Sequence, residues 1–487
     1  MIVVYIQAQF ESDLNDARRN SASLRDPAGY VFELDGRILR RLNEGASKNW
    51  LKFTELPIAE QLMAAGDLVP TWLASDIAVA QCRTMDGICS DETGIILEHE
   101  RIPFLSYACE WSQTMLRDAA LLHLYFMERL MPLGWTLKDA NPANVQWRLD
   151  KPCLIDVASI EPYAGGPWRA YGQFCKTMLF PLFISAYGGG QSLQSVLKGY
   201  GLKGVDAVSA SRYLRGMAVF KPGVFVHLKL QALLQRLADR GQANRAGAAK
   251  LGNLESKVSV TSVLTLIRGL RHALMSLPLP EKTSWVGYTQ TSIYTDEQLK
   301  LKQSLVASWF RQFGSAGDVV LDVGANTGTY SKLLAQQGAK VIAVDADMAC
   351  VDSLYRQAHE GVLPLVLNLV EPTGPTGWDL GEQKAFADRI NPDWSIWLAV
   401  IHHLSVHEGV RMDEVVRRII KTSRYSIVEF VGREDPMVQA LLQARSEERS
   451  DYSINNFHYL ISELGVEILA KSVITDNRTL YLLRCVR

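Results

Sequence analysis

Residues 320–330 read Val320-Leu321-Asp322-Val323-Gly324-Ala325-Asn326-Thr327-Gly328-Thr329-Tyr330, and they decide the fold of the C-terminal part of this chain. The pattern predicts a buried strand, a turn punctuated by glycines and the start of a helix. A second apolar run, 341–344, follows and ends at Asp345. Acids at the ends of two neighbouring strands, Asp322 and Asp345, predict a small-molecule site at the carboxyl edge of an open α/β sheet.

Strands and helices alternate from residue 318 onward, which predicts a parallel sheet covered on both faces. Near-continuous apolar runs fit strands that are buried on both sides. We therefore expect a Rossmann-like, seven-stranded α/β domain over residues 290–487. The expected strands are 319–323, 340–344, 363–369, 394–401 and 425–430, with a closing antiparallel pair at 465–470 and 479–485. The expected helices lie near 329–337, 348–359, 379–390, 406–422 and 435–444.

The glycine turn indicates which ligand the site takes. A turn that binds the pyrophosphate of NAD has the pattern G-x-G-x-x-G, but Asn326 replaces the middle Gly and Thr329 the last. That departure disfavours a pyrophosphate and suits S-adenosylmethionine (SAM), which has no phosphate. The alternative is a ligand-free turn with a capping Asp. We expect the following to bind the cofactor: Asp322, Gly324, Asn326 and Gly328 around its amino-acid end, and Asp345 at the ribose hydroxyls.

The pattern D-x-G-x-N-x-G with a downstream V-D resembles the class I SAM-dependent methyltransferases. The resemblance implies that Asn368, in the third strand, accepts a hydrogen bond from the adenine amino group, where such enzymes often have Asp. It also implies that Ala399, near the end of the fourth strand, lines the cofactor site. No metal is expected there.

Imidazole side chains follow the fourth strand, at His402-His403. The methyl acceptor would lie at this mouth of the site, where a His can take a proton from a hydroxyl or amine. His403 is the first catalytic candidate, followed by His402 and by Glu429 at the end of the fifth strand. The alternatives are a His that caps a helix and a structural Glu429. A metal pair is not expected, because adjacent residues on a strand end point apart.

Residues 1–289 predict a separate α+β domain, with a hairpin on Asp35-Gly36 and long helical stretches up to about 236. Asp139 and Asn144 have the D-x-x-x-x-N spacing of a kinase catalytic loop, and Asp156 follows a short apolar strand. This resembles the protein-kinase-like fold and implies that these three residues would hold Mg-ATP. A Gly-rich loop is missing near 28–38, and Arg40 or Arg41 would have to replace the usual Lys. The alternatives are a kinase-derived binding or scaffolding domain, and an Asx-rich loop that bonds its own backbone.

Composition limits location and partners. The chain has 487 residues, 48% apolar and 21% charged, with a net charge of −1, so no overall basic field favours nucleic acid or an anionic membrane. No apolar stretch is long enough to span a bilayer, and the N-terminus lacks the basic region of a signal peptide. Seven scattered Cys indicate reduced thiols and a cytoplasmic protein.

Taken whole, the chain resembles bacterial SAM-dependent methyltransferases related to nodulation-associated proteins. The resemblance rests on runs such as Ile102–Tyr107, Leu137–Gln146, Asp322–Gly328 and Ala399–Leu404. It implies O- or N-methylation of a small molecule or glycan. One alternative is a phosphotransferase or a bifunctional kinase–methyltransferase, and another is a scaffold that binds SAM without turnover. The sequence specifies neither the acceptor nor the oligomeric state.

Overall fold

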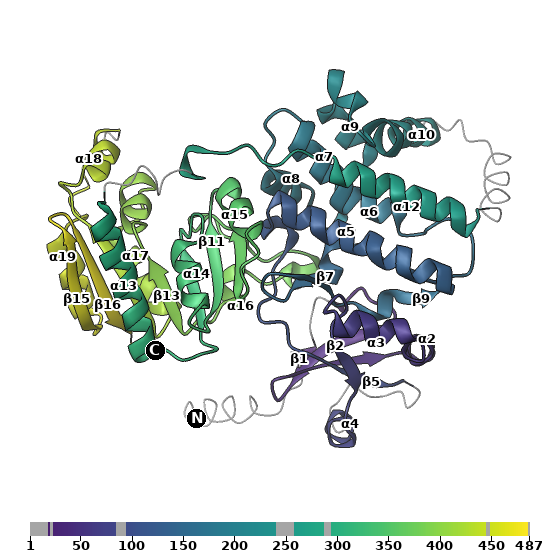
Figure 1. Ribbon diagram of the computed structural model, residues 1–487, viewed down its shortest axis with the longest axis horizontal. Coiled ribbons are helices and arrows are strands. Elements are labelled where there is room, and N and C mark those ends of the chain that lie inside the picture. Colours follow the sequence, from purple (N-terminus) through teal and green to yellow (C-terminus); the bar gives the residue numbers. More distant parts are fainter. Residues whose placement is uncertain are drawn as a thin grey trace, which may run out of the picture.

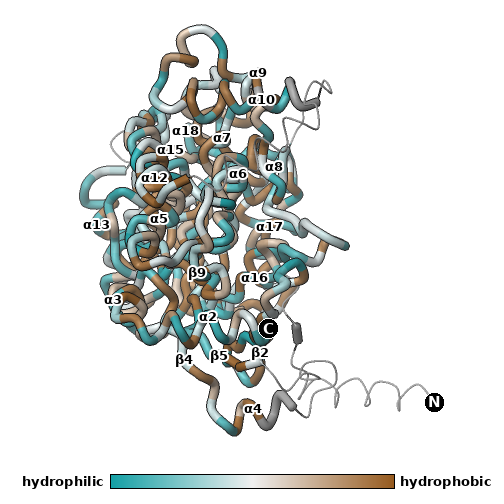
Figure 2. Tube along the Cα trace, turned by 90° about the vertical axis from the view of Figure 1, so that its right-hand side faces the viewer, coloured by the Kyte–Doolittle hydropathy of each residue, from teal (hydrophilic) through white to brown (hydrophobic). Residues whose placement is uncertain are grey.

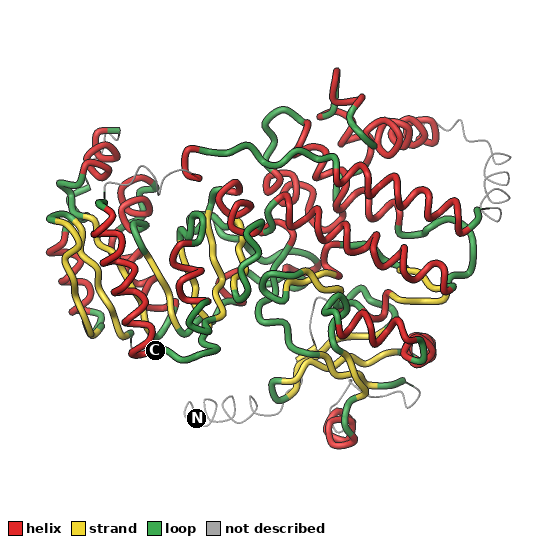
Figure 3. The backbone as a smooth tube through the Cα atoms, in the orientation of Figure 1, coloured by secondary structure: helices red, strands yellow, loops and turns green. Residues whose placement is uncertain are grey.

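The computed structural model describes residues 18–19, 23–83, 94–239, 258–286, 294–444 and 449–485. The domain boundary predicted at 289–290 lies outside the described residues, as do the first six residues and Cys89. A large sheet with its helices forms one part of the molecule, and a small sheet with a helical region forms the other (Figure 3). No described helix combines the length and the apolar character needed to cross a bilayer.

The C-terminal part is built on the predicted seven-stranded, mostly parallel sheet, which is confirmed (Figure 1). The strand order is β12-β11-β10-β13-β14-β16-β15, and β16 pairs antiparallel with both of its neighbours, β14 and β15. The strands are β10 (Val319–Val323), β11 (Lys340–Asp345), β12 (Val362–Val366), β13 (Trp394–Trp397), β14 (Tyr425–Val431), β15 (Glu467–Thr475) and β16 (Arg478–Arg484). The helices are α13 (Asp296–Phe313), α14 (Thr329–Ala335), α15 (Met348–Tyr355), α16 (Phe386–Arg389), α17 (Met412–Thr422), α18 (Pro436–Gln443) and α19 (Ile454–Glu463).

Alternate residues of these strands enter two separate hydrophobic clusters, so the sheet is buried on both faces. Val320 of β10 and Val341 of β11 are register partners and pack with Val306 of α13. Their neighbours Leu321 and Ile342 belong to the other cluster. The period-2 alternation of side chains explains why one run of apolar residues serves both faces.

Several predicted elements are shorter than expected. β12 ends at Val366, and Asn368 then accepts a hydrogen bond from the Val370 backbone N–H at 3.0 Å, a turn that competes with the strand. β13 ends at Trp397, two residues before Ala399, whose φ is +55°. The helix predicted over 406–422 begins only at Met412, because Gly409 has a φ of +81°. Of the helix predicted over 379–390, only α16 forms, together with a short 3₁₀ turn over 378–380.

The N-terminal sheet is antiparallel, in the order β1-β2-β3-β5-β4. The predicted hairpin is confirmed: Asp35 and Gly36 both have positive φ, 49° and 74°, which suits the twist of a two-residue turn. The strands are β1 (Arg18–Arg19), β2 (Gly29–Leu34), β3 (Arg37–Leu42), β4 (Thr71–Leu73) and β5 (Ile96–His99), and the helices around them are α2 (Glu44–Thr54), α3 (Pro57–Ala64) and α4 (Asp76–Arg83).

Helices dominate the rest of the N-terminal part. α5 (Gln113–Leu130) is capped by Ser112, whose side chain accepts from the Met115 N–H, and α12 (Val260–Met275) packs against α5. Between them lie α6 (Tyr171–Phe174), α7 (Phe180–Tyr187), α8 (Leu193–Tyr200), α9 (Ala207–Tyr213), η9 (Gly216–Phe220), η10 (Val224–Lys229) and α10 (Leu230–Asp239). Short strands β6 (Trp135–Leu137), β7 (Val145–Trp147), β8 (Pro152–Leu154) and β9 (Ile160–Pro162) carry the loop with the predicted Asp and Asn.

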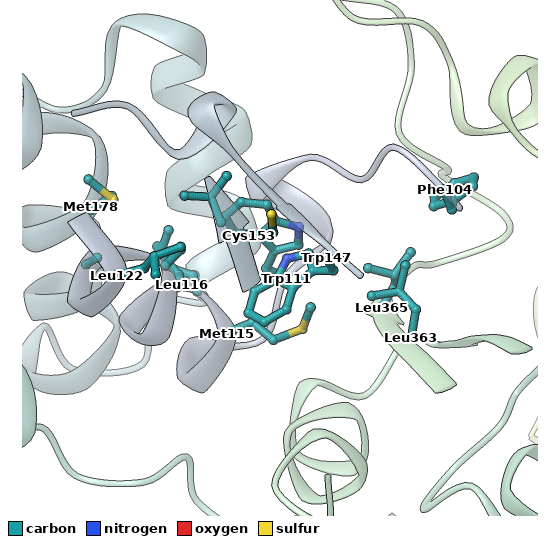
Figure 4. Packing of buried hydrophobic residues seen from close by; sticks show 14 of the residues in the cluster. Phe104, Trp111, Met115, Leu116, Leu122, Trp147, Cys153, Met178, Leu363 and Leu365 are labelled. Carbon is teal, nitrogen blue, oxygen red and sulfur yellow. The ribbon is translucent and has the colours of Figure 1, made fainter. Parts of the chain in front are cut away.

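The two parts share one hydrophobic core (Figure 4). Trp111 and Trp147 of the N-terminal part belong to the same buried cluster as Leu363 and Leu365 of β12. Polar contacts cross the same interface. The Asp352 carboxylate of α15 accepts from the Ser112 hydroxyl and the Thr114 N–H, both at 2.9 Å, and so caps α5 from the other part. The buried Arg389 and Glu110 side chains form an ion pair across it. The seven-stranded sheet is therefore fixed against the N-terminal part.

Candidate cofactor and active site

The predicted glycine turn leaves β10 and leads into α14. Gly324 and Gly328 have φ of +67° and +77°, which favours glycine at both positions. A Cβ on Gly324 would lie 2.7 Å from the Val400 side chain, and one on Gly328 would lie 2.4 Å from Leu354. Packing within the protein is thus sufficient reason for both glycines. Their close approach to a ligand stays a prediction.

Among the described residues, Asp345 at the end of β11 is held by backbone groups alone. Its Oδ2 accepts from the Asn326 N–H at 2.8 Å, and its Oδ1 accepts from the Asp347 N–H at 2.9 Å. It forms no ion pair with any described residue. Burial raises the pKa of this carboxyl, and the hydrogen bonds from the two N–H groups partly offset that rise. Each oxygen keeps a further lone pair, so the oriented carboxylate can accept from two hydroxyls.

Asp322 lies nearly buried in β10, where its Oδ2 accepts from the Ser331 hydroxyl at 2.6 Å. Burial raises the pKa of Asp322 to about 7; the Ser331 hydrogen bond opposes this and the nearby Asp345 adds to it. A cation that approached this carboxyl would favour its ionised form. The site therefore suits the ammonium of an amino acid.

Asn326 connects the glycine turn to a residue that the sequence analysis missed. Its side-chain Oδ1 accepts from the Thr327 N–H at 2.7 Å, and its Nδ2 donates to the Trp285 carbonyl at 2.9 Å. The Trp285 ring lies edge-on to His403, with 5.8 Å between ring centroids. Trp285 thus lies against both the glycine turn and His403. In the sequence this segment is preceded by Pro278-Leu279-Pro280, which interrupts helical patterns but carries no functional motif.

His402 and His403 lie in a helical turn, so the expectation that they point apart was wrong: their ring centroids are 4.2 Å apart. His402 is buried, and neither ring nitrogen bonds to a described residue. Burial lowers the pKa of His403 to about 4, with His407 and Arg478 adding to the shift. Burial lowers the pKa of His402 well below its usual value, and the charge of a protonated His403 would lower it further. Both rings are therefore neutral at pH 7 and able to accept a proton.

Glu429 lies within β14, which continues to Val431, and so does not end the strand as expected. The side chain is fully buried, and Oε2 accepts from Lys302 Nζ at 2.7 Å while Oε1 accepts from the Tyr294 hydroxyl. Arg478 donates to that same hydroxyl at 2.8 Å. Glu429 is thus neutralised by a network with α13.

Asn368 and Ala399 follow β12 and β13, whose ends lie at the same edge of the sheet as those of β10 and β11. Asn368 is exposed, and its side-chain oxygen already accepts one backbone N–H. One lone pair remains for an adenine amino group. The sheet order thus brings these two residues to the same edge as Asp322 and Asp345.

One of the predicted nucleotide residues of the N-terminal part, Asp156, is paired with an arginine. Arg40 Nη1 donates to Asp156 Oδ1 at 2.5 Å. Burial raises the pKa of Asp139, and Asp156 lies near enough to add to the shift. The Asn144 Nδ2 atom is buried and makes no hydrogen bond to a described residue. Within the described ranges no group of three His, Cys, Asp or Glu side chains could hold a metal ion.

A cavity of about 340 Å³ lies between the two parts. Its walls come from the loop before α5, the loop after Asp139, the region around α8 and the segment that follows β12. None of the predicted site residues lines it. The lining includes Tyr107, Cys109, Asn141, Thr177, Tyr200, Thr373 and Gln383.

Comparison with known proteins gives a distant relative and several structural likenesses. No protein-family model matches the chain. It is a distant homologue of nodulation protein NoeA of Rhizobium meliloti (strain 1021), 29% identical over 471 residues that cover 95% of each chain. Among solved structures, the magnesium protoporphyrin IX methyltransferase ChlM from Synechocystis PCC 6803 with bound SAH matches 42% of this chain and 90% of its own, at 16% identity and a TM-score of 0.30. The bifunctional kinase-methyltransferase WbdD matches 39% of this chain and 40% of its own, at 17% identity and a TM-score of 0.29.

Proposed function

We propose that residues 290–487 bind SAM and that the chain transfers its methyl group to a hydroxyl or amine of a small-molecule or glycan acceptor. The observation that carries this proposal is Asp345. Its carboxylate is oriented by two backbone N–H groups beside a glycine turn and has no ion-pair partner among the described residues. A carboxylate held in this way is suited to a ribose.

The residues at this edge fit the groups of the cofactor. Asp322 would face the ammonium, which favours the ionised form of that carboxyl. Asn368 would accept from the adenine amino group. Gly324, Gly328 and Ala399 would complete the backbone around the ligand. SAM supplies a methyl group that its sulfonium already activates.

The protein then has to align the acceptor and remove one proton. As the carbon–sulfur bond breaks and the new carbon–oxygen or carbon–nitrogen bond forms, the neutral His403 imidazole takes the acceptor proton. His402, whose ring nitrogens are unpartnered among the described residues, is the second candidate. Glu429 comes last, because its ion pair with Lys302 favours a structural role.

The N-terminal domain, residues 1–289 in our proposal, would select the acceptor. Its support is the cavity between the two parts, whose volume and mostly uncharged lining fit a small neutral ligand. A phosphotransferase remains the second candidate, on the spacing of Asp139, Asn144 and Asp156. The ion pair between Arg40 and Asp156 weighs against it.

Calorimetric titration with SAM tests the cofactor assignment. We expect Asp345→Ala to weaken SAM binding by about tenfold or more, which is about 1.4 kcal/mol. Asp413→Asn is a matched control, because Asp413 pairs with Arg411 on the surface of the same domain. Absence of SAM binding by the wild-type protein would overturn the proposal.

Transfer of a labelled methyl group from SAM into a cell extract tests the chemistry. We expect His403→Gln to lower turnover by about 10²–10⁴-fold with an unchanged Kd for SAM, because a general base acts only in the transfer step. Its pKa of about 4 predicts a rate that stays flat from weakly acidic to neutral pH. Tight SAM binding with no transfer to any acceptor would favour the scaffold instead.

A further inference from the structure

Basic charge is concentrated in one region of a nearly neutral chain. Residues 162–238 contain nine Lys and Arg and a single acid, Asp206, whereas the whole chain has a net charge of −1. All nine are exposed except the half-buried Lys229. They are Arg169, Lys176, Lys198, Lys203, Arg212, Arg215, Lys221, Lys229 and Arg236.

Large apolar side chains are exposed in the same region. Met217 and Phe220 are 78% and 79% exposed, and Phe225 is 60% exposed. Val226, Leu230 and Leu233 follow at the i, i+4 and i+7 spacing that places residues on one side of a helix. The opposite side of this helix is buried through Val224, Leu228 and Ala232. We call residues 212–236, which run from the end of α9 through η9 and η10 into α10, the basic–apolar face.

The packing holds the basic and apolar groups together. α9, η9, η10 and α10 contact one another and form an outer edge of the helical region (Figures 1 and 2). Lys229 Nζ donates to the Ser211 carbonyl at 2.9 Å, and Arg236 donates to the Ser211 hydroxyl at 3.0 Å. Burial lowers the pKa of Lys229, and so do the neighbouring Arg236 and Arg215. No acid among the described residues forms an ion pair with a cation of this face.

We propose that the basic–apolar face binds peripherally to the surface of an anionic lipid bilayer. Such a surface attracts Lys and Arg to its headgroups and accepts apolar side chains at the boundary of the acyl chains. A second copy of the chain is a poorer occupant, because two faces of the same positive charge repel. A nucleic acid would match the charge but would leave Met217 and the aliphatic side chains in water. The proposal is independent of methyl transfer.

Flotation with lipid vesicles tests it on the full-length protein. We expect binding to phosphatidylcholine vesicles that contain about one third phosphatidylglycerol, little binding to phosphatidylcholine alone, and release in high salt. Met217→Ser with Phe220→Ser, and separately Arg215→Glu with Lys221→Glu, should each weaken binding by about tenfold. The control is Trp378→Ser with Leu380→Ser, which removes two exposed apolar side chains outside the face and should leave binding unchanged.

Thermal unfolding of each variant shows whether it is folded, and all four substitutions lie at exposed positions. Four results would overturn the proposal. The first three are no binding by the wild-type protein, an equal loss of binding in the control, and wild-type self-association that the face variants abolish. Binding to duplex DNA that depends on the charged but not on the apolar residues would also overturn it. SAM titration of the same variants should be unchanged, so a failure here is distinct from a failure of the proposed methyl transfer.

Discussion

Two loops of this molecule place acids after short apolar strands, and they differ in what surrounds those acids. Asp156 of the N-terminal part is paired with the Arg40 guanidinium at 2.5 Å. Within the described part of the chain, Asp345 of the C-terminal part accepts hydrogen bonds only from backbone N–H groups. In the sequence the two patterns are equally suggestive. The partner of each carboxylate distinguishes a neutralised site from one that is available to a ligand.

Glu429 belongs with the neutralised acids, and its removal should have the largest effect. Glu429→Ala leaves Lys302 buried without a counter-ion, so we expect the free energy of unfolding to fall by about 3–5 kcal/mol. Urea denaturation measures this. The control is Glu467→Ala, which breaks an exposed pair with Arg484 and should cost about 1 kcal/mol or less. If Glu429→Ala lowered the free energy of unfolding by no more than Glu467→Ala does, the Glu429–Lys302 pair would not be structural. Glu429 would then again be a catalytic candidate.

Asp322 has no ion-pair partner among the described residues, and its charge state should have a measurable effect on how stability depends on pH. Its pKa is about 7 in the folded protein, against an ordinary value of 3.8 in the unfolded chain, so between these values the native state binds a proton that the unfolded state has lost. Stability should therefore fall as pH rises through this window, by on the order of 1.4 kcal/mol per pH unit at most. Asp322→Asn should remove about that slope from the dependence of stability on pH. Urea midpoints measured from pH 4.5 to 7.5 test this.

The affinity for SAM offers a second way to measure the ionisation of the Asp322 carboxyl. If the cofactor ammonium binds beside Asp322, SAM affinity should rise with pH up to about 7 in the wild-type protein. The Asp322→Asn variant should bind more weakly and lose this pH dependence. An unchanged profile in the variant would place the titrating group elsewhere.

Arg40 offers a smaller effect and the sharpest contrast. Arg40→Met leaves Asp156 without its cation, and we expect a loss of about 2 kcal/mol in the free energy of unfolding. The double variant Arg40→Met, Asp156→Ala should recover part of that loss, because it removes the stranded charge as well. SAM affinity should not change in either. A change would mean that the two loops are coupled.

Much of the C-terminal fold followed from local sequence. Apolar runs such as 341–344, a glycine turn and an acid at the strand end are contiguous, so the strands could be predicted and the sheet is confirmed. The strand ends could not, because they depend on single residues: the turn made by Asn368 and the positive φ of Ala399. Both interrupt runs whose composition still favours a strand.

Most of the contacts that define the site could not be predicted from the sequence. Arg40 and Asp156 are 116 positions apart, and Glu429 and Lys302 are 127 apart. Trp285 reaches the glycine turn only because of the path the chain takes from the N-terminal part. Spacing identifies which residue types can do chemistry, whereas the identity of the counter-ion is a property of the tertiary fold.

The smallest expected effect is the heat of Mg-ATP binding. Asp156 would have to exchange its ion pair with Arg40 for a metal ion, and Arg40 would then remain beside that metal with only the more distant Asp26, at 3.7 Å, as a counter-ion. We expect no magnesium-dependent binding in calorimetric titration of the wild-type protein. Arg40→Met tests the reason, because it frees the carboxylate; Mg-dependent binding that emerges only in this variant would show that the arginine blocks the site. Wild-type binding that Asp156→Ala abolishes would instead show that the ion pair opens readily, and the two acid loops would then be two ligand sites.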